Sequence, residues 1–145
     1  MPTLNRRDFI RLADIHCRII VQLRYIIDVH PGVGQLAGHR RQGARVRIVL
    51  DEEPRDALHR PSADVLMASA AAAYGARTVG VVLTGMGSDG TKGLGVLKDK
   101  EAYIIGQDEA SCIVYGMPKA PAELGYLDVV VPLGKIADEI VKSIK

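Results

Sequence analysis

The chain has 145 residues, 48% of them hydrophobic, which is enough for one domain with a substantial buried core. It contains no Trp, one Phe and five Tyr, so we expect no nucleic-acid partner bound by aromatic stacking. The formal net charge is only +2, but six arginines lie between residues 40 and 60 and five between residues 5 and 24. These arginines form either a solvated face or a surface for an acidic partner.

The two cysteines, Cys17 and Cys112, are far apart and have no metal-ligand spacing. We therefore expect reduced thiols and no metal site. No apolar stretch reaches the length of a membrane span, and the N-terminus lacks the apolar core of a signal peptide. The sequence predicts a soluble cytoplasmic protein without membrane insertion.

The first 44 residues carry a weak pattern. Residues 6–28 are compatible with a helix that runs into a strand, and residues 29–43 are rich in glycine without periodicity. No element is predicted for the second of these stretches.

From residue 45 the elements are clearer. Residues 45–50 read as a short β-branched strand. Residues 62–75 predict an alanine-rich helix that Ser62 caps and Gly75 ends. Residues 79–83 predict a buried strand, which a glycine-rich loop follows.

Residues 91–100 predict a helix, and its two glycines indicate close packing against the sheet. A buried strand at 102–106, a short helix at 117–125, a strand at 128–133 and an amphipathic helix at 134–145 complete the chain. This alternation predicts one α/β domain. We expect a doubly wound, mostly parallel sheet with helices on both faces.

The loop after strand 79–83 contains Gly85, Gly87 and Gly90, spaced as G-x-G-x-x-G. This spacing between a strand and a helix is typical of a dinucleotide-binding loop. Asp108 and Glu109 follow the next strand and are candidates to bind a ribose hydroxyl.

Asp89 lies inside this loop and argues against a phosphate site. A carboxylate about 4 Å from a phosphate would repel it by ~1–4 kcal/mol. Two other hypotheses remain open for Asp89. It is either a cap for the helix that follows, or a fixed carboxylate at the carboxyl edge of the sheet, suited to a nucleophile–histidine–carboxylate triad.

Four stretches of the chain, residues 59–66, 80–90, 106–125 and the tail from 129, closely resemble the CheB family of chemotaxis protein-glutamate methylesterases. The most specific are T-G-M-G-S-D-G at 84–90 and E-A-S-C-I-V-Y-G-M-P at 109–118. The resemblance covers about residues 45–145. It implies a doubly wound α/β domain that hydrolyses glutamate methyl esters on chemoreceptors with a Ser-His-Asp triad and no metal or organic cofactor.

Carried over by its motif, the catalytic aspartate is Asp89. Met86 matches a methionine beside the substrate site, and Ser111 and Cys112 lie in a loop near it. The chain has no match to the family's Gly-x-Ser-Thr-Gly-Gly nucleophile turn or to its Gln-His-Met-Pro histidine motif. We therefore expect one of the three catalytic groups, and no activity from this chain alone.

The resemblance also implies partners. These are the cytoplasmic helices of methylated chemoreceptors and an upstream receiver domain, which this sequence does not contain. The family's first βαβ portion has no clear match in residues 1–44, so we expect a homo-oligomer or an exchange of segments between chains. A non-catalytic interaction module and a dinucleotide-binding domain remain as alternatives.

Overall fold

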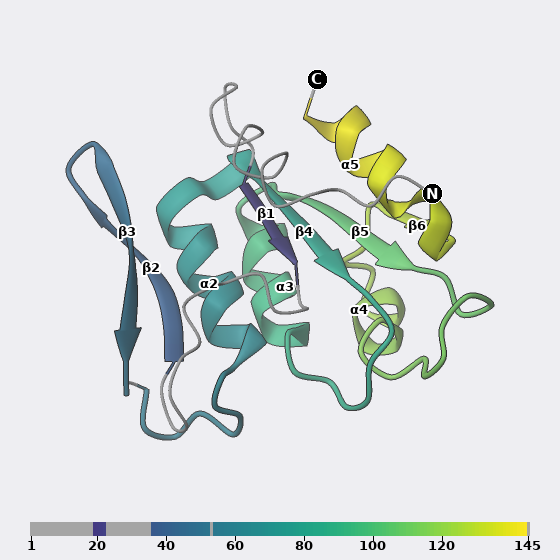
Figure 1. Cartoon of the computed structure of the whole chain (residues 1–145), viewed down its shortest axis with the longest axis horizontal. Coiled ribbons are helices and arrows are strands. Elements are labelled where there is room, and N and C mark those ends of the chain that lie inside the picture. The colour runs from purple at the N-terminus through teal and green to yellow at the C-terminus, as the bar shows by residue number, and fades with distance from the viewer. Residues whose placement is uncertain (1–18, 23–35, 53, 145) are drawn as a thin grey trace.

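The computed structural model describes residues 19–22, 36–52 and 54–144 of the chain (Figure 1). Its main sheet contains β1 (Ile19–Gln22), β4 (Thr78–Val82), β5 (Tyr103–Gln107) and β6 (Val129–Val131). The strand order is β1-β4-β5-β6, and all three pairings are parallel. The predicted strands at 79–83, 102–106 and 128–133 are thus confirmed. The helix expected before residue 19 lies outside the described residues.

Helices cover both faces of this sheet, as Figure 1 shows. On one face, α2 (Ala63–Tyr74) and α3 (Thr91–Asp99) pack over β4 and β5, and on the other lies α5 (Ile136–Ser143). The side of α2 and α3 buries a core that includes Met67, Val82, Leu94, Leu97 and Ile104. The side of α5 buries Val79, Val81, Ile105 and Ile136. The doubly wound α/β architecture predicted from the sequence is therefore confirmed.

Local signals set the helix ends correctly. The Ser62 side chain accepts a hydrogen bond from the Val65 amide (3.4 Å), and Gly75 follows the last turn of α2 at φ 58°. The short helix expected at 117–125 is α4 (Lys119–Glu123), with Gly125 beyond it at φ 71°. Two 3₁₀ turns, η1 (Gly75–Arg77) and η2 (Leu133–Lys135), lead into β4 and α5.

The predicted strand at 45–50 exists as β3 (Arg45–Asp51), but it does not join the parallel sheet. It pairs antiparallel with β2 (Leu36–Gln42) in a separate two-stranded ribbon beside α2 (Figure 1). The interpretation of β3 as part of the βα repeat was wrong. Its alternation of arginine with aliphatic residues suits a ribbon with exposed faces rather than a central strand. The two-residue turn begins at Gly43, whose φ is 60°.

The glycines of α3 also have other partners than expected. A Cβ on Gly93 would lie 2.7 Å from Met67 Cβ and 2.9 Å from the Asp64 carbonyl oxygen, so Gly93 brings α3 against α2. Gly95 faces the ring of Tyr126, not the sheet. The close packing was predicted correctly, but the predicted surface was wrong. Gly80 of β4 is the glycine that makes room between helix and sheet, because Leu94 and Leu97 lie over it.

Candidate functional site

Asp89 lies beyond the carboxyl end of β4, at the end of the loop that leads into α3. Two glycines turn the backbone around it, Gly87 at φ 87° and Gly90 at φ 97°, conformations that are strained for residues with a Cβ. Gly90 is the N-cap residue of α3. The geometry therefore agrees with the position predicted for this carboxylate at the carboxyl edge of the sheet.

The Asp89 carboxylate is held by the start of α2. Its Oδ2 accepts a hydrogen bond from the Ala63 amide (2.7 Å), and its Oδ1 accepts from the Asp64 amide and the Ser62 hydroxyl (3.2 Å each). The alternative that Asp89 caps the helix that follows it is wrong, because the helix it caps precedes it in the chain. The start of α2 thus provides three hydrogen-bond donors to the Asp89 side chain.

Asp64, in the first turn of α2, makes a similar contact with the start of α3. Its Oδ1 accepts a hydrogen bond from the Gly93 amide (2.8 Å) in the first turn of α3. The start of α2 is thus bonded by Asp89 from the loop before α3, and the start of α3 is bonded by Asp64 of α2. The close approach of the two helices at Gly93 makes this exchange of carboxylates possible. The position of Asp89 is consequently fixed by α2, α3 and the loop together.

The same contacts oppose the dinucleotide alternative. A phosphate bound at the glycine loop would need free amides at the start of α3, but the Gly93 amide is already bonded to Asp64. Asp108, the candidate for the ribose, accepts hydrogen bonds from the amide (3.0 Å) and the hydroxyl of Ser111. Asp89 and Asp64 bring negative charge to this edge, and Asp108 is already bonded to Ser111, so the edge is poorly suited to a pyrophosphate.

A second loop, residues 108–118, packs against the loop that carries Asp89. The Thr84 hydroxyl oxygen accepts hydrogen bonds from the amides of Ile113 (3.1 Å) and Val114 (3.0 Å), and the hydroxyl donates to the Val114 carbonyl (3.1 Å). A Cβ on Gly116 would lie 2.5 Å from the Gly85 carbonyl oxygen, so glycine is required where the two backbones meet. The two loops, residues 83–90 and 108–118, are thus joined into one continuous rim at the carboxyl edge of the sheet.

The side chain of Gln107 joins this rim to the sheet. It is fully buried, accepts a hydrogen bond from the Thr84 amide (2.8 Å) and donates to the carbonyl (2.7 Å) and hydroxyl (3.2 Å) oxygens of Ser111. The Leu133 amide also donates to the Ser111 hydroxyl (3.0 Å). Ser111 is therefore committed to structure and is not placed as a nucleophile. Sequence reasoning missed Gln107, whose only signal was a polar residue at the end of a buried strand.

Exposed apolar side chains lie on the rim. Met86 is 88% exposed and Ile113 is 92% exposed, one on each loop. Cys112 is next to Ile113, and desolvation raises the pKa of its thiol, with Asp108 and Glu109 acting in the same direction and a hydrogen bond with Thr84 opposing them. A thiol with a raised pKa is a poor nucleophile near neutral pH, so the surroundings of Cys112 do not activate it as a nucleophile.

Among the described residues, no histidine is hydrogen-bonded to Asp89. His39 instead lies beside Ser69, whose hydroxyl oxygen is 3.4 Å from His39 Nδ1 and accepts a hydrogen bond from the His39 amide (2.9 Å). Ser69 donates to the Leu66 carbonyl (2.7 Å), and it is about 10 Å along α2 from Ser62 by helical rise. This pair is separate from the Asp89 edge. His16 and His30 lie outside the described residues.

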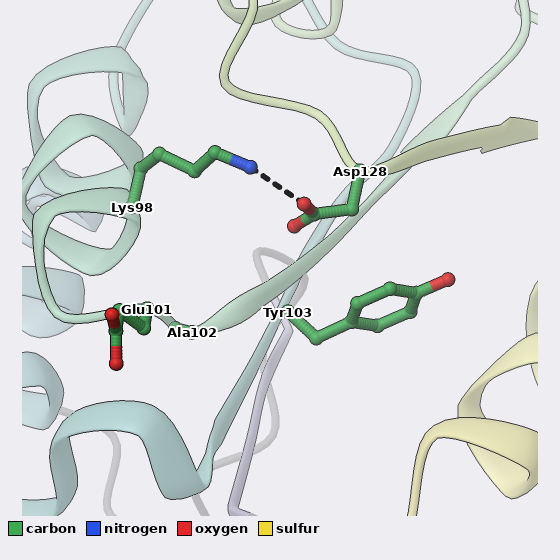
Figure 2. Close-up of a pocket in the computed structure, with 5 residues that line it drawn as sticks. All are labelled: Lys98, Glu101, Ala102, Tyr103 and Asp128. Carbon is green, nitrogen blue, oxygen red and sulfur yellow. Dashed lines mark hydrogen bonds and ion pairs between the residues drawn. The ribbon is translucent and has the colours of Figure 1, made fainter.

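A shallow cavity of about 380 Å³ lies at the opposite edge of the sheet, at the start of β5 (Figure 2). Lys98 reaches across it to Asp128 (2.5 Å), whose other oxygen accepts from the Ile104 amide (2.8 Å). Tyr103 on its border donates to Glu139 of α5 (3.1 Å). These groups stabilise the amino edge of the sheet, and none of the predicted site residues is among them.

The described part of the chain contains no group of three or more His, Cys, Asp or Glu side chains arranged to hold a metal ion. None of its helices has the length and apolar character needed to cross a membrane.

Comparison with known proteins gives consistent results. The family model described as CheB methylesterase matches residues 8–140. Protein-glutamate methylesterase/protein-glutamine glutaminase 4 of Anaeromyxobacter dehalogenans is 50% identical over 103 residues, which are 71% of this chain and 29% of that protein. Protein-glutamate methylesterase/protein-glutamine glutaminase 2 of Nitratidesulfovibrio vulgaris is 43% identical, over 99% of this chain and 41% of that protein.

The solved structures include a similar fold. The crystal structure of the Thermotoga maritima CheB methylesterase catalytic domain superimposes with a TM-score of 0.71 at 37% identity, covering 75% of this chain and 58% of that one. The chain spans less than half the length of the two curated relatives.

Proposed function

Because the chain belongs to the CheB methylesterase family, we propose that it supplies the carboxylate-bearing part of a protein-glutamate methylesterase site. The substrates in this proposal are glutamate methyl esters on chemoreceptor helices, and the products are glutamate and methanol. The observation that carries the proposal is the position of Asp89, at the carboxyl edge of the sheet and held by three donors from the start of α2.

Ester hydrolysis by a triad divides three roles among three groups. A serine attacks the ester carbonyl, a histidine takes the serine proton and later protonates the leaving methoxide, and a carboxylate holds the histidine tautomer. Asp89 Oδ2 accepts one hydrogen bond from the described residues and has capacity for another, which suits an imidazole N–H. In this proposal Asp89 takes the third role, and Met86 forms an apolar wall beside the methyl ester.

The family's serine and histidine motifs have no match in this chain, so we expect the isolated chain not to hydrolyse the ester. The test measures methanol release from methylated receptor. We expect background rates for the chain and for its Asp89→Asn variant alike. No histidine among the described residues is hydrogen-bonded to Asp89, and Ser62, the serine that is, serves as the N-cap of α2. Saturable release by the chain alone that depends on Asp89 would contradict this part of the proposal.

A chimeric protein tests whether Asp89 can act as the triad carboxylate. Residues 45–145 of this chain would replace the matching segment of the Nitratidesulfovibrio vulgaris relative, which would keep its own preceding residues. We expect methylesterase activity, and a loss of up to ~10⁴-fold on Asp89→Asn. Asp99→Asn, an exposed aspartate of α3, is the matched control and should retain activity. A fully active Asp89→Asn chimera would refute the triad role.

The proposal also concerns the partners of the site and the two alternative functions. We infer that the receptor helices approach the rim bearing Met86, and that a receiver domain acts on the site in the cytoplasm without metal or organic cofactor. A non-catalytic interaction module would bind receptor yet leave the chimera inactive. A dinucleotide-binding domain would bind NAD in a calorimetric titration, which we expect to give no heat because Asp89 and Asp64 occupy the amides of the two helix starts.

A further inference from the structure

Among the described residues, the hydrogen bonds that join the ribbon of β2 and β3 to α2 come from the β2 edge. On β2, the His39 amide donates to the Ser69 hydroxyl (2.9 Å), and Arg41 Nε donates to the Ala73 carbonyl at the end of α2 (3.0 Å). The other edge of the ribbon is β3. No strand among the described residues pairs with that edge.

The pairing register identifies the backbone groups on the open edge. His39 is opposite Ile48, and the His39 amide points to α2, so these two residues exchange no hydrogen bonds with each other. The amide and carbonyl of Ile48 therefore point away from β2, and those of Val46 and Leu50 do so by alternation. None of the three amides has a hydrogen-bond partner in the described part of the chain.

The side chains of β3 alternate in character. Arg45 and Arg47 lie on one face, and Val46, Ile48 and Leu50 lie on the other, where Ile48 is 51% and Leu50 is 37% exposed. Across the ribbon, Arg47 is paired directly with Arg40 of β2. Acidic side chains on a strand added beside β3 would lie next to Arg45 and Arg47, and opposite charges on neighbouring strands attract each other.

We propose that the open edge of β3 binds an extended peptide by strand addition, and that this peptide alternates acidic with aliphatic residues. Its backbone would pair with Val46, Ile48 and Leu50. On one face its carboxylates would meet Arg45 and Arg47, and on the other its aliphatic side chains would cover Ile48 and Leu50. This site is independent of the proposed methylesterase activity.

Two other occupants fit less well. A second copy of the chain paired edge to edge would place Arg45 and Arg47 of both copies on the same face of the joined sheet, where their like charges repel. Single-stranded nucleic acid would find no Phe, Tyr or Trp side chain on residues 36–51 for its bases to stack on. The observations therefore favour an acidic polypeptide strand.

The experiment uses a labelled peptide of repeating Glu-Val in fluorescence anisotropy. The matched control has the same composition with all glutamates in one block, which keeps the charge and removes the alternation. We expect binding of the repeating peptide to be at least about tenfold tighter, and to weaken as salt is raised. Amide exchange measured by NMR should slow at Val46, Ile48 and Leu50 when the peptide binds.

Two sets of variants separate backbone pairing from charge. Ile48→Pro removes an outward amide without removing a β2–β3 hydrogen bond, and should abolish binding, whereas Ile48→Ala keeps the amide and should retain most of it. The double variant Arg45→Glu, Arg47→Glu should weaken binding by about tenfold or more, and the distant pair Lys92→Glu, Lys100→Glu should not. If Ile48→Pro fails to fold, the charge variants and the amide exchange still decide.

Several results would overturn the proposal. Equal binding of the repeating and block peptides would mean that the arginines attract acidic chains without strand addition. No peptide binding at all would leave the arginines as protection of an edge strand against aggregation. Binding of duplex DNA or anionic vesicles through Arg45 and Arg47, with no response to the peptide, would assign the ribbon to another class of partner.

Discussion

The Asp89 side chain has a structural role that is independent of any catalysis. It accepts two amide hydrogen bonds and one hydroxyl hydrogen bond at the start of α2. Asp89→Asn keeps one acceptor oxygen but loses the charge, so we expect the free energy of unfolding to fall by ~1–2 kcal/mol. Urea denaturation of the isolated chain measures this. The exposed Asp99→Asn should change stability little, and an unchanged midpoint for Asp89→Asn would mean that α2 does not depend on this cap.

His39 gives the ribbon a pH dependence. Burial lowers the pKa of its imidazole below the ordinary 6.5, and its ring meets Tyr74 edge-on at 5.5 Å between ring centroids. The folded state therefore binds fewer protons than the unfolded state. The stability that neutral His39 contributes is full above the unfolded pKa and is lost as pH falls below about 6.5.

Thermal melts from neutral to mildly acidic pH test this effect. His39→Gln, which does not titrate, should reduce the loss of melting temperature on acidification. The exposed His59→Gln should leave the loss as it is in the parent chain. A parent chain whose melting temperature rises toward acidic pH would contradict the sign of the effect.

At the scale of elements, the contact between α2 and α3 depends on Gly93. Alanine favours a helix over glycine by roughly 1 kcal/mol, yet a Cβ here would lie 2.7 Å from Met67 Cβ and 2.9 Å from a backbone oxygen. We expect Gly93→Ala to destabilise the chain by ~1–3 kcal/mol, since the backbone must shift. Gly95→Ala on the same helix meets only the Tyr126 ring at 3.2 Å, which can move, and should be nearly neutral. Equal effects of the two substitutions in chemical denaturation would refute this account.

At the scale of the whole molecule, the edges of the outer strands β1 and β3 that are unpaired in the part of the chain described by the structure determine where two copies of the chain could associate. Within the described residues β1 pairs only with β4, and β3 only with β2. Because the arginines of β3 oppose self-pairing, we predict that any dimer forms through the β1 side of the main sheet. Sedimentation should show a dimer or a larger assembly that persists in Arg45→Glu. A monomer at high concentration would refute the assembly, and loss of the dimer in Arg45→Glu would move the interface to β3.

Much of this molecule follows from local rules in its sequence. Ser62 and Gly75 mark the ends of α2 because capping depends on neighbouring residues. The order strand, glycine loop, Asp89 and helix fixes the carboxylate at the carboxyl edge of a parallel sheet. The family motif at 84–90 then points to the same residue.

Non-local contacts were not predictable in the same way. The Asp89 bonds to α2 join residues 25 to 27 positions apart, and no local pattern distinguishes them from a cap on α3. The strand β2 depends on pairing with β3, and its own sequence has little strand propensity apart from that partner. The strand predicted within residues 6–28 exists as β1, but its bounds were not predictable because the surrounding apolar run suits a helix equally well. Gly43 at a two-residue turn was the one available signal for the ribbon.

The exchange of carboxylates between α2 and α3 has a consequence for how the domain opens and folds. Each helix gains one first-turn partner only when the other helix is docked, because the Ala63 amide donates to Asp89 and the Gly93 amide donates to Asp64. Closing these contacts orders the whole intervening segment, including β4, in one step. The two helix starts should then exchange their amide protons as one cooperative unit, so the carboxyl edge opens only when α2 and α3 separate.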